Sequence, residues 1–263
     1  MNFRLAASSY LNSAPLIWSF LYGPHQGSVD FVEAVPARCA QMLAESSVEG
    51  ALVPVIEYQR IAGGSLVPNV CVGSRKEVLS VVLVSKNKHL ENIRSVALDE
   101  SSRTSVTLVK VIFREFLDHE PEWTMRAPNL EQMLEKNDAA LIIGDPGMTF
   151  PRRGLNVWDM ASLWKHHTGL GFVFAMWMVR DDAIDRARLV DFSGVRDEGV
   201  AHIEEIVRSY RDKIPMPVEE LRNYLTENIV FKVDESMEKG LRLYFELAFK
   251  HKLIEKVKPL RFI

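Results

Sequence analysis

The chain has 263 residues, of which 47% are hydrophobic and 25% are charged, a balance that excludes disordered and collagen-like chains. This length suits one large domain or two lobes of roughly 100 to 150 residues each. The 32 basic and 35 acidic residues leave a net charge of −3, and no stretch gathers Lys and Arg as a nucleic-acid partner would require.

The N-terminus and the apolar runs predict the location of the protein. Residues 1–5 run directly into mixed polar sequence, without the apolar core of roughly 7 to 15 residues that marks an export signal. The longest uncharged apolar runs, such as residues 169–179, are shorter than the roughly 20 residues that cross a bilayer. We therefore expect a cytoplasmic protein with no membrane partner.

The cysteines and histidines give no metal-binding pattern. Cys39 and Cys71 lie far apart, with no second Cys or His at the spacing of metal ligands, so we expect buried thiols. His166 and His167 are adjacent, and adjacent side chains point in different directions. The sequence therefore predicts no metal site.

Strand and helix signals alternate along the first third of the chain. Strands are predicted at residues 4–7, 29–32 and 51–53. A helix is predicted from about Pro15 to Gly23, and another from Pro36 to about Ala44. This alternation predicts a parallel sheet.

A second alternating set follows the buried strand 79–85 and the polar tract 86–89, where we expect the chain to cross between lobes. Further strands are predicted at residues 95–99, 139–143 and 171–179, the last as the return crossing. The apolar stripe of a helix is formed by Val106, Val109, Phe113, Phe116 and Leu117. Residues 144–147, Gly-Asp-Pro-Gly, predict a tight turn. Helices are predicted around residues 185–189, 199–213, 218–227 and 236–250.

The simplest arrangement of these elements is an α/β protein of two lobes, each with a mixed, mostly parallel sheet flanked by helices. We expect residues 1–86 and 176–263, with the C-terminal helices, to form the first lobe. Residues 87–175 should form the second lobe. A ligand cleft is expected between the two.

The most informative polar segment follows strand 95–99 and opens the helix after it. It consists of Ser101, Ser102, Arg103, Thr104 and Ser105. Free backbone N–H groups, the positive end of the helix dipole, several hydroxyls and a guanidinium together suit a carboxylate or phosphate. The alternative is a helix N-cap, which needs only one hydroxyl. Four hydroxyls and one arginine favour a ligand site.

A second polar segment, with Ser9, Tyr10, Asn12 and Ser13, also lies between a strand and a helix start. These side chains suit uncharged contacts to a ligand better than proton transfer, and a second helix cap is the alternative. Ser80 is a lone polar residue in an apolar strand, and it is either a site residue or a hydrogen-bonded hydroxyl of the core.

Two carboxylates are candidates for acid-base chemistry. Glu57 and Asp145 each follow an apolar strand and can reach a cleft. The alternatives are a helix-start charge for Glu57 and a turn residue for Asp145, which follows Gly144. Residues 164–169 are a further candidate wall, although exposed loop histidines are more often inert. No Ser-His-Asp order, phosphate loop or glycine fingerprint is present.

Five segments in order along the chain, residues 9–16, 52–58, 102–106, 143–145 and 168–175, resemble the chorismate dehydratases of the futalosine route to menaquinone. The resemblance covers the first two-thirds of the chain. It implies a periplasmic-binding-protein type II-like fold that works inside the cell as an enzyme, without a metal or organic cofactor. It also implies that the dicarboxylate chorismate loses water to give 3-(1-carboxyvinyloxy)benzoate.

Matching positions imply roles for the polar residues. Asn12 and Ser80 are placed at the reacting region as catalytic residues, and the segment from Ser101 to Ser105 is placed around a substrate carboxylate. The other expected substrate-binding residues are Ser9, Tyr10, Ser13, Glu57, Gly144 and Asp145. No residue is assigned as the general base, and a substrate carboxylate is one candidate for this role.

Two positions differ from the pattern of the family that this chain resembles, and two alternative functions are considered. Gly171 stands where such sequences usually have Pro, and Leu163 or its neighbour stands where a Glu often lies. The alternatives are the sister 1,4-dihydroxy-6-naphthoate synthase, against which the Tyr-Leu-Asn-Ser opening argues, and a small-anion (carboxylate) binding protein. A monomer and a homodimer are both compatible with the sequence.

Overall fold

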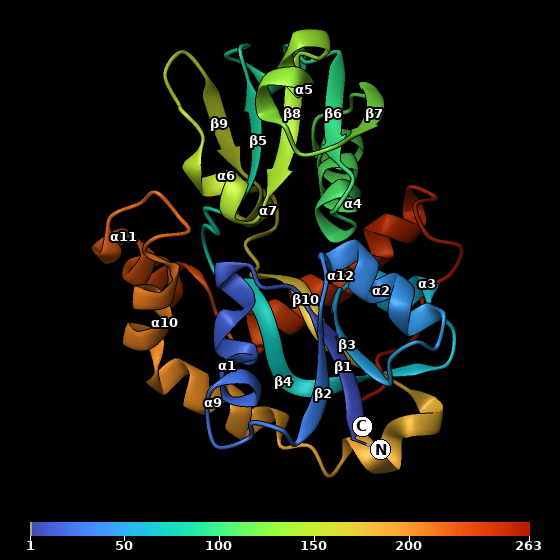
Figure 1. Ribbon diagram of the computed structural model, residues 1–263. Helices are drawn as coiled ribbons and strands as arrows, with labels where there is room; N and C mark the ends of the chain where they lie inside the picture. The colour runs from blue at the N-terminus through green and yellow to red at the C-terminus, as the bar shows by residue number, and fades with distance from the viewer. Residues whose placement is uncertain (1) are drawn as a thin grey trace.

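The computed structural model describes residues 2–263 and contains two five-stranded sheets, one above the other in Figure 1. The strand order is β2-β1-β3-β10-β4 in the first sheet and β7-β6-β8-β5-β9 in the second. Helices flank both sheets, so the expected α/β architecture is confirmed.

The first sheet combines parallel and antiparallel pairs. Its strands are β1 (Phe3–Ala7), β2 (Val29–Glu33), β3 (Gly50–Pro54), β4 (Gly64–Ser74) and β10 (Phe172–Arg180). β1 pairs in parallel with β2 and β3, while β10 is antiparallel to β3 and β4. Every residue of β3 is buried, as its continuous apolar sequence requires of a strand covered on both faces.

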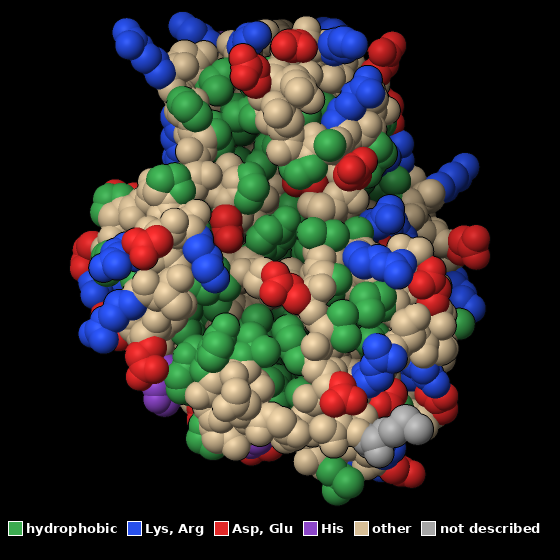
Figure 2. All heavy atoms as spheres, viewed as in Figure 1, with side chains coloured by type: hydrophobic (Ala, Val, Ile, Leu, Met, Phe, Trp, Pro, Cys, Tyr) green, Lys and Arg blue, Asp and Glu red, His purple; other side chains and the backbone are tan. Residues whose placement is uncertain are grey.

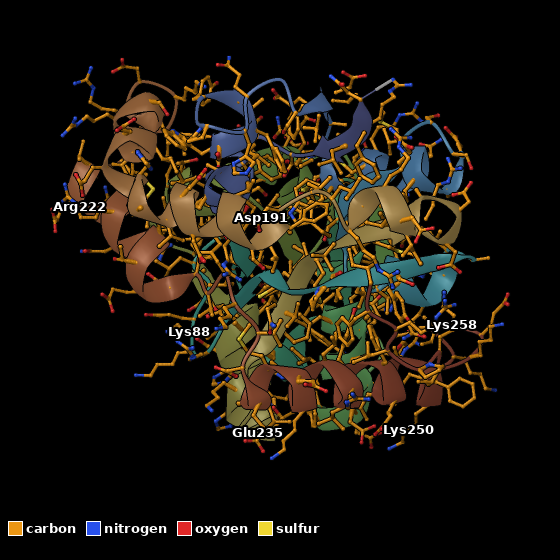
Figure 3. All side chains as sticks on the ribbon, turned by 90° about the horizontal axis from the view of Figure 1, so that it is seen from below. Lys88, Asp191, Arg222, Glu235, Lys250 and Lys258 are labelled. Atoms are coloured by element: carbon orange, nitrogen blue, oxygen red, sulfur yellow. The ribbon has the colours of Figure 1, made fainter. Side chains whose placement is uncertain are left out.

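The helices of this half of the chain come from its beginning and its end. Those from the beginning are η1 (Leu11–Leu16), α1 (Trp18–Leu21), α2 (Pro36–Ala44) and α3 (Glu57–Arg60). Those from the end are η4 (Asp181–Ala183), α8 (Ile184–Ala187), α9 (Phe192–Ala201), α10 (Ile203–Tyr210), α11 (Val218–Asn223), η5 (Tyr224–Asn228) and α12 (Glu235–Lys250). Figure 3 shows α12 running along one side from Glu235 to Lys250, and it contacts both β10 and α4.

The second sheet is also mixed. Its strands are β5 (Val81–Ser85), β6 (Ser95–Asp99), β7 (Glu122–Arg126), β8 (Ala139–Ile143) and β9 (Asn156–Asp159). Its helices are η2 (Leu90–Asn92), α4 (Thr104–Val111), η3 (Ile112–Phe116), α5 (Leu130–Lys136), α6 (Asp145–Thr149) and α7 (Met160–Thr168). β6 is parallel to β7 and β8, and β5 is antiparallel to β8 and β9.

Sheet membership differs from the expected lobe boundaries at residues 86 and 175. β5 pairs with β8 from Val81↔Ile143 to Ser85↔Ala139, so this strand belongs to the second sheet and the expected crossing at 86–89 comes too late. The whole of β10 belongs to the first sheet. The chain therefore passes between the sheets at residues 75–80 and 169–171, and we propose that the two lobes divide there.

The first connection between the sheets contains a defined turn at Val78 and Leu79. Leu79 has a φ of 58°, a left-handed conformation that is unusual for a non-glycine residue. Asp159 Oδ2 accepts hydrogen bonds from the backbone N–H groups of Val78 (2.9 Å) and Leu79 (2.7 Å). These bonds hold the turn that leads from the first sheet into β5.

Two further expectations are corrected. The predicted tight turn 144–147 is instead the start of α6, which follows Gly144 with its φ of 69°. Residues 164–168 lie in the helix α7 and not in an exposed loop, and His167 stacks on Phe116 with ring centroids 4.5 Å apart. In both segments the helix satisfies the backbone hydrogen bonds locally. Pro146 is compatible with α6 because it stands in the first turn, where no N–H donor is needed.

The lobes share one large hydrophobic core, and a smaller cluster around Val82, Met133 and Ile142 covers the other face of the second sheet. Cys39 and Cys71 are free and buried, as expected, and burial raises the pKa of Cys39 to about 12. Among residues 2–263, no helix combines the length and the hydrophobicity needed to span a bilayer.

Candidate functional site

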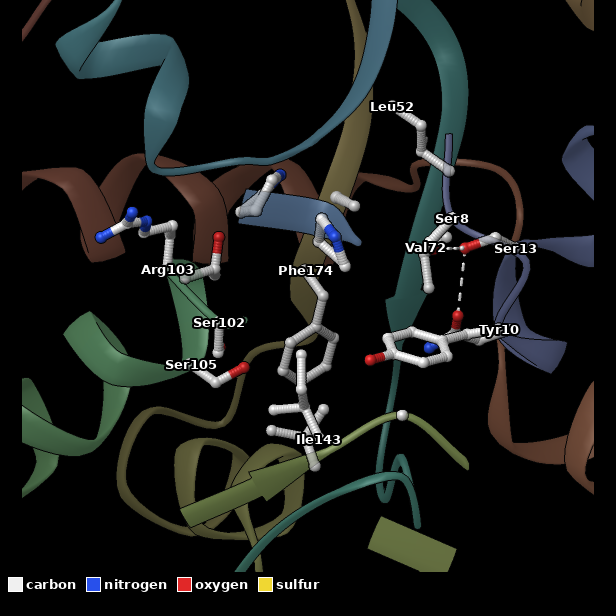
Figure 4. A pocket seen from close by; sticks show the side chains of 17 residues that line it. Ser8, Tyr10, Ser13, Leu52, Val72, Ser102, Arg103, Ser105, Ile143 and Phe174 are labelled. Atoms are coloured by element: carbon white, nitrogen blue, oxygen red, sulfur yellow. Dashed lines mark hydrogen bonds between the residues drawn. The ribbon is translucent and has the colours of Figure 1, made fainter. Parts of the chain in front are cut away.

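A pocket lies between the two lobes, where loops from both sheets meet (Figure 4). Figure 2 shows a narrower upper lobe that sits directly on a wider lower lobe. Apolar side chains from both sides form much of the pocket wall, and they include Leu52, Val72, Val81, Ile143 and Phe174. Phe174 of β10 stands between Ser105 and Tyr10 in Figure 4. The pocket therefore offers an aromatic surface with polar groups on either side.

The start of α4 supplies the first polar group. Ser102, Thr104 and Ser105 are buried and line the pocket. The carboxylate of Asp99 fixes the turn before them, because its Oδ1 accepts from the backbone N–H (2.9 Å) and the hydroxyl (2.6 Å) of Ser101. Ser101 is thus held by Asp99 and does not line this pocket. Burial raises the pKa of Asp99, although its hydrogen bonds with Ser101 oppose the rise.

Arg103 stands at the rim of the pocket. It is exposed, and Figure 4 shows its guanidinium pointing away from Phe174 and Tyr10. It enters none of the ion pairs found among residues 2–263. Arg103 can therefore attract an anion without first breaking a contact within the protein.

The turn after β1 supplies the second polar group. Tyr10, Asn12 and Ser13 line the pocket together with Ser8, whose hydroxyl lies 3.1 Å from that of Ser13. Asn12 Oδ1 accepts a hydrogen bond from Ser13 Oγ at 3.1 Å. These residues form a connected set of neutral donors and acceptors that faces the start of α4.

Tyr10 touches the second lobe at Gly144, which also lines the pocket. A Cβ at Gly144 would lie 2.8 Å from the Tyr10 ring, and Gly144 has the positive φ that glycine tolerates best. Burial raises the pKa of Tyr10, so its hydroxyl stays neutral near pH 7. Gly144 therefore lets the two lobes approach closely at this point.

Four other predicted residues lie outside the pocket wall. Ser9 turns to Glu33, and Glu57 pairs with Arg60 at 2.8 Å. Ser80 is fully buried. Asp145 accepts from the backbone N–H of Leu11 at 3.0 Å, and burial raises its pKa to about 6.

The pocket also contains residues that the sequence did not single out as site residues. Phe174 lies in the segment 168–175 that carries the family resemblance but was assigned no role there, and Ser8 was not distinguished from the neighbouring polar residues. The pocket wall, as far as the described residues form it, contains no His, Lys, Asp or Glu. No three His, Cys, Asp or Glu side chains gather in a metal-binding arrangement anywhere in residues 2–263. The arrangement can hold an anionic ligand through neutral donors and one arginine.

A model of the protein family described as "Menaquinone biosynthesis" matches residues 3–250. The chain belongs to this family. A chorismate dehydratase of Thermus thermophilus is 28% identical over 234 residues, which cover 82% of this chain and 85% of the relative. A chorismate dehydratase of Campylobacter jejuni is 26% identical over 241 residues, with coverages of 89% and 92%. The resemblance seen in the sequence is confirmed.

Solved structures confirm the fold of this family member. The protein AF1704 of Archaeoglobus fulgidus has a TM-score of 0.79 at 17% identity, over 96% of this chain and 98% of its own. The periplasmic aliphatic sulphonate binding protein SsuA of Escherichia coli has a TM-score of 0.62 at 14% identity, over 100% and 94%. The expected periplasmic-binding-protein-like fold is therefore present.

The two departures noted in the sequence lie outside the pocket wall. Gly171 donates its backbone N–H to Ser236 Oγ at 3.0 Å, a bond that proline cannot make. A Cβ at Gly171 would also lie 2.7 Å from Cγ of Met237 on α12. Leu163 packs against the hydrophobic core. Both departures therefore belong to the packing of α7 and α12.

Proposed function

We propose that this protein is a chorismate dehydratase, which removes water from chorismate to give 3-(1-carboxyvinyloxy)benzoate. The observation that carries the proposal is a single pocket in which the start of α4 faces the turn after β1 across Phe174. Two curated relatives of that name, aligned over most of the chain, support it.

The reaction is an elimination without oxidation or reduction. A ring C–H bond breaks, its electron pair forms a new ring double bond, and the neighbouring C–O bond breaks. The released hydroxide takes up a proton and leaves as water. Because the product ring is aromatic, the protein mainly needs to hold two carboxylates and to assist the departing groups.

The start of α4 is the proposed carboxylate site. Backbone N–H groups of its first turn, the positive end of the helix dipole and the hydroxyls of Ser102 and Ser105 favour a negative charge there. Arg103 at the rim adds a long-range attraction for an anionic substrate. Phe174 presents an aromatic face or edge against which the substrate ring can pack.

Asn12 is the proposed contact of the reacting region, where its amide donates a hydrogen bond to the departing hydroxyl. Burial raises the pKa of Tyr10, so its hydroxyl stays protonated near pH 7 and is not available as a base, and the described wall of the pocket has no other candidate base. A substrate carboxylate therefore serves as the base in this proposal, held in place by the donors around it.

The test is to incubate the purified protein with chorismate and to follow products by chromatography and mass spectrometry. We expect loss of one water from the substrate, and a fall in kcat/KM of about 100-fold or more in Asn12→Ala and Arg103→Ala. Arg38→Ala is the matched control, since Arg38 is an exposed arginine of α2 that pairs with Glu45 at 3.4 Å and does not line the pocket. Full activity in Asn12→Ala would remove this residue from the mechanism.

A small-anion binding protein is the second candidate, because solved binding proteins share the fold. Chorismate that binds but stays unchanged would favour it. Chorismate that neither binds nor reacts would favour the sister 1,4-dihydroxy-6-naphthoate synthase. We further propose that the protein is cytoplasmic. We also propose that it is a monomer or a homodimer, since one chain supplies both sides of the pocket.

A further inference from the structure

Asp99, the last residue of β6, is a buried carboxylate behind the pocket wall. Its side chain is 0% exposed, and it does not itself line the pocket. Its Oδ1 accepts hydrogen bonds from the backbone N–H (2.9 Å) and the hydroxyl (2.6 Å) of Ser101. Its Oδ2 accepts from the backbone N–H of Ile143, the last residue of β8, at 3.3 Å. One side chain therefore holds the turn before α4 and the end of β8 together.

The pairing of the two strands explains why Asp99 reaches both segments. β6 and β8 are parallel, with Leu98 opposite Leu141, so both strands end at the same edge of the sheet. Asp99 follows Leu98 directly and therefore lies beside the last residues of β8. An ionised carboxylate accepts on both of its oxygens and donates on neither, so it can serve N–H groups on two sides at once.

Both of the segments that Asp99 holds reach the pocket. The N–H of Ser102 donates to the backbone carbonyl of Asp99 at 3.1 Å, and Ser102 lines the pocket. Ile143 lines it as well. The carbonyl of Ser101 also accepts from the N–H of Ala37 in α2 at 3.2 Å, so the turn contacts the first lobe. Loss of the Asp99 carboxylate would therefore release two parts of the pocket wall.

We propose that Asp99 is a positioning residue, which fixes the turn before α4, where the substrate carboxylate binds, relative to the end of β8. The inference rests on the proposed function for its effect on turnover, whereas the fixed geometry is a property of the chain. Asp99 acts through Ser101, Ser102 and Ile143 and does not touch the substrate. Its own negative charge repels an anion, so positioning and charge predict opposite effects when that charge is removed.

The test uses Asp99→Asn, which keeps the size of the side chain and removes its charge. An amide has a single acceptor oxygen, so it cannot accept from both Ser101 and Ile143. The first measurement is the backbone amide NMR signals of these two residues, of which at least one should shift and exchange its proton faster. We also expect the Kd and the KM for chorismate to rise about 10- to 100-fold while kcat changes little, because a carboxylate site binds substrate and transition state alike.

Asp138→Asn is the matched control, because Asp138 joins the same two strands at the opposite edge of the sheet. It directly precedes β8, and its Oδ2 accepts from the N–H groups of Arg94 (2.7 Å) and Ser95 (3.2 Å), where β6 begins. It does not line the pocket. This variant should leave the Kd, the KM and kcat for chorismate unchanged. General damage to the fold would reduce the share of active protein, which lowers the apparent kcat and leaves KM as it was.

If Asp99→Asn does not fold, Ser101→Ala replaces it, because it removes only the hydroxyl that donates to Asp99. It should shift the amide signal of Ser102 and raise the Kd and the KM about 3- to 10-fold.

Three results would overturn the inference: unshifted signals of Ser101 and Ile143, an unchanged or lower Kd and KM, or the same rise in Asp138→Asn. If the wild type binds chorismate without dehydrating it, the proposed function fails, and the amide signals and the Kd still decide the inference. A wild type that does not bind chorismate would overturn both.

Discussion

Asp145 of the second lobe accepts a hydrogen bond from the backbone N–H of Leu11 in the first lobe at 3.0 Å. Two other bonds cross between the lobes at Thr104, whose Oγ1 accepts from the N–H of Ile56 at 3.2 Å and whose carbonyl accepts from Tyr244 at 2.9 Å. The lobes are thus in direct contact around the pocket.

Asp145→Asn tests the charge in this contact. Burial raises the pKa of Asp145 to about 6, so the folded protein favours the protonated form. The stability that this preference contributes is full below the ordinary carboxyl pKa and is lost as the pH rises through about 6. Asparagine keeps an oxygen that can accept from Leu11. The variant should therefore be about 1 to 3 kcal/mol more stable than the wild type at pH 8.

The measurement is the unfolding midpoint of both proteins in urea between pH 4 and pH 8, with Asp145→Ala as control because it lacks the acceptor. The gain of Asp145→Asn over the wild type should grow as the pH rises through 6. A difference that is constant across this range would show that the charge of Asp145 is not desolvated.

Gly144→Ala tests the close approach of the lobes at Tyr10. The new Cβ would meet the Tyr10 ring at 2.8 Å, and the φ of 69° with ψ of −153° is nearly restricted to glycine. We expect a loss of about 2 to 4 kcal/mol in the free energy of unfolding, measured by urea denaturation.

Gly154→Ala is the matched control for this substitution. Gly154 has a similar φ of 76°, but a Cβ there would meet no atom within 4 Å. It should lose only about 1 kcal/mol, the contribution of backbone strain alone. Equal losses in the two variants would mean that the contact with Tyr10 has no energetic effect.

The sequence predicted the strands that are buried on both faces, such as β3 and β8, because continuous apolar runs mark them. β7 and β9 were missed, since they lie at the edges of the second sheet and are partly exposed. β4 was missed because Pro68 and Asn69 look like a turn. Asn69 has a φ of 59° where the pairing with β10 shifts register, so that part of the strand is bulged.

The polar segments at strand ends predicted much of the pocket, because strand ends meet at one edge of a sheet. Which side chain faces the ligand could not be read in the same way. Tyr10 lines the pocket while its neighbour Ser9 bonds to Glu33, and a pattern of residue types does not separate the two. Tyr224 is distant in sequence from Ser80, to which its hydroxyl donates a hydrogen bond, and only the fold brings the two together.

Gly171→Pro tests why this chain departs from the pattern expected of its relatives. Proline would remove the bond from the N–H of Gly171 to Ser236 and would crowd Met237. We expect a loss of about 2 to 4 kcal/mol in thermal or urea unfolding. Ser236→Ala is the control and should lose only about 1 kcal/mol, the value of the hydrogen bond. Unchanged stability in Gly171→Pro would mean that α12 can shift to admit the ring.

Glu115→Gln tests an ion pair between the lobes. Glu115 of η3 contacts Lys250 at 2.8 Å and His251 at 2.7 Å, where α12 ends. The hydrogen bond from Lys250 is the largest of the effects that lower the pKa of Glu115. The stability from this lowered pKa is present above the ordinary carboxyl pKa and is lost as the pH falls through the lowered value. At pH 7 we expect the variant to lose about 0.5 to 1 kcal/mol.

The control is Glu235→Gln, which breaks a pair with Lys239 at 2.6 Å inside α12 and leaves the contact between the lobes intact. Urea unfolding is measured at pH 7 and at pH 3, and Glu235→Gln should lose less stability at pH 7 because its pair lies within one helix. The loss in Glu115→Gln should shrink toward pH 3 and in high salt, where charges are screened. A loss that persists at pH 3 would assign the effect to packing and not to the charge of Glu115.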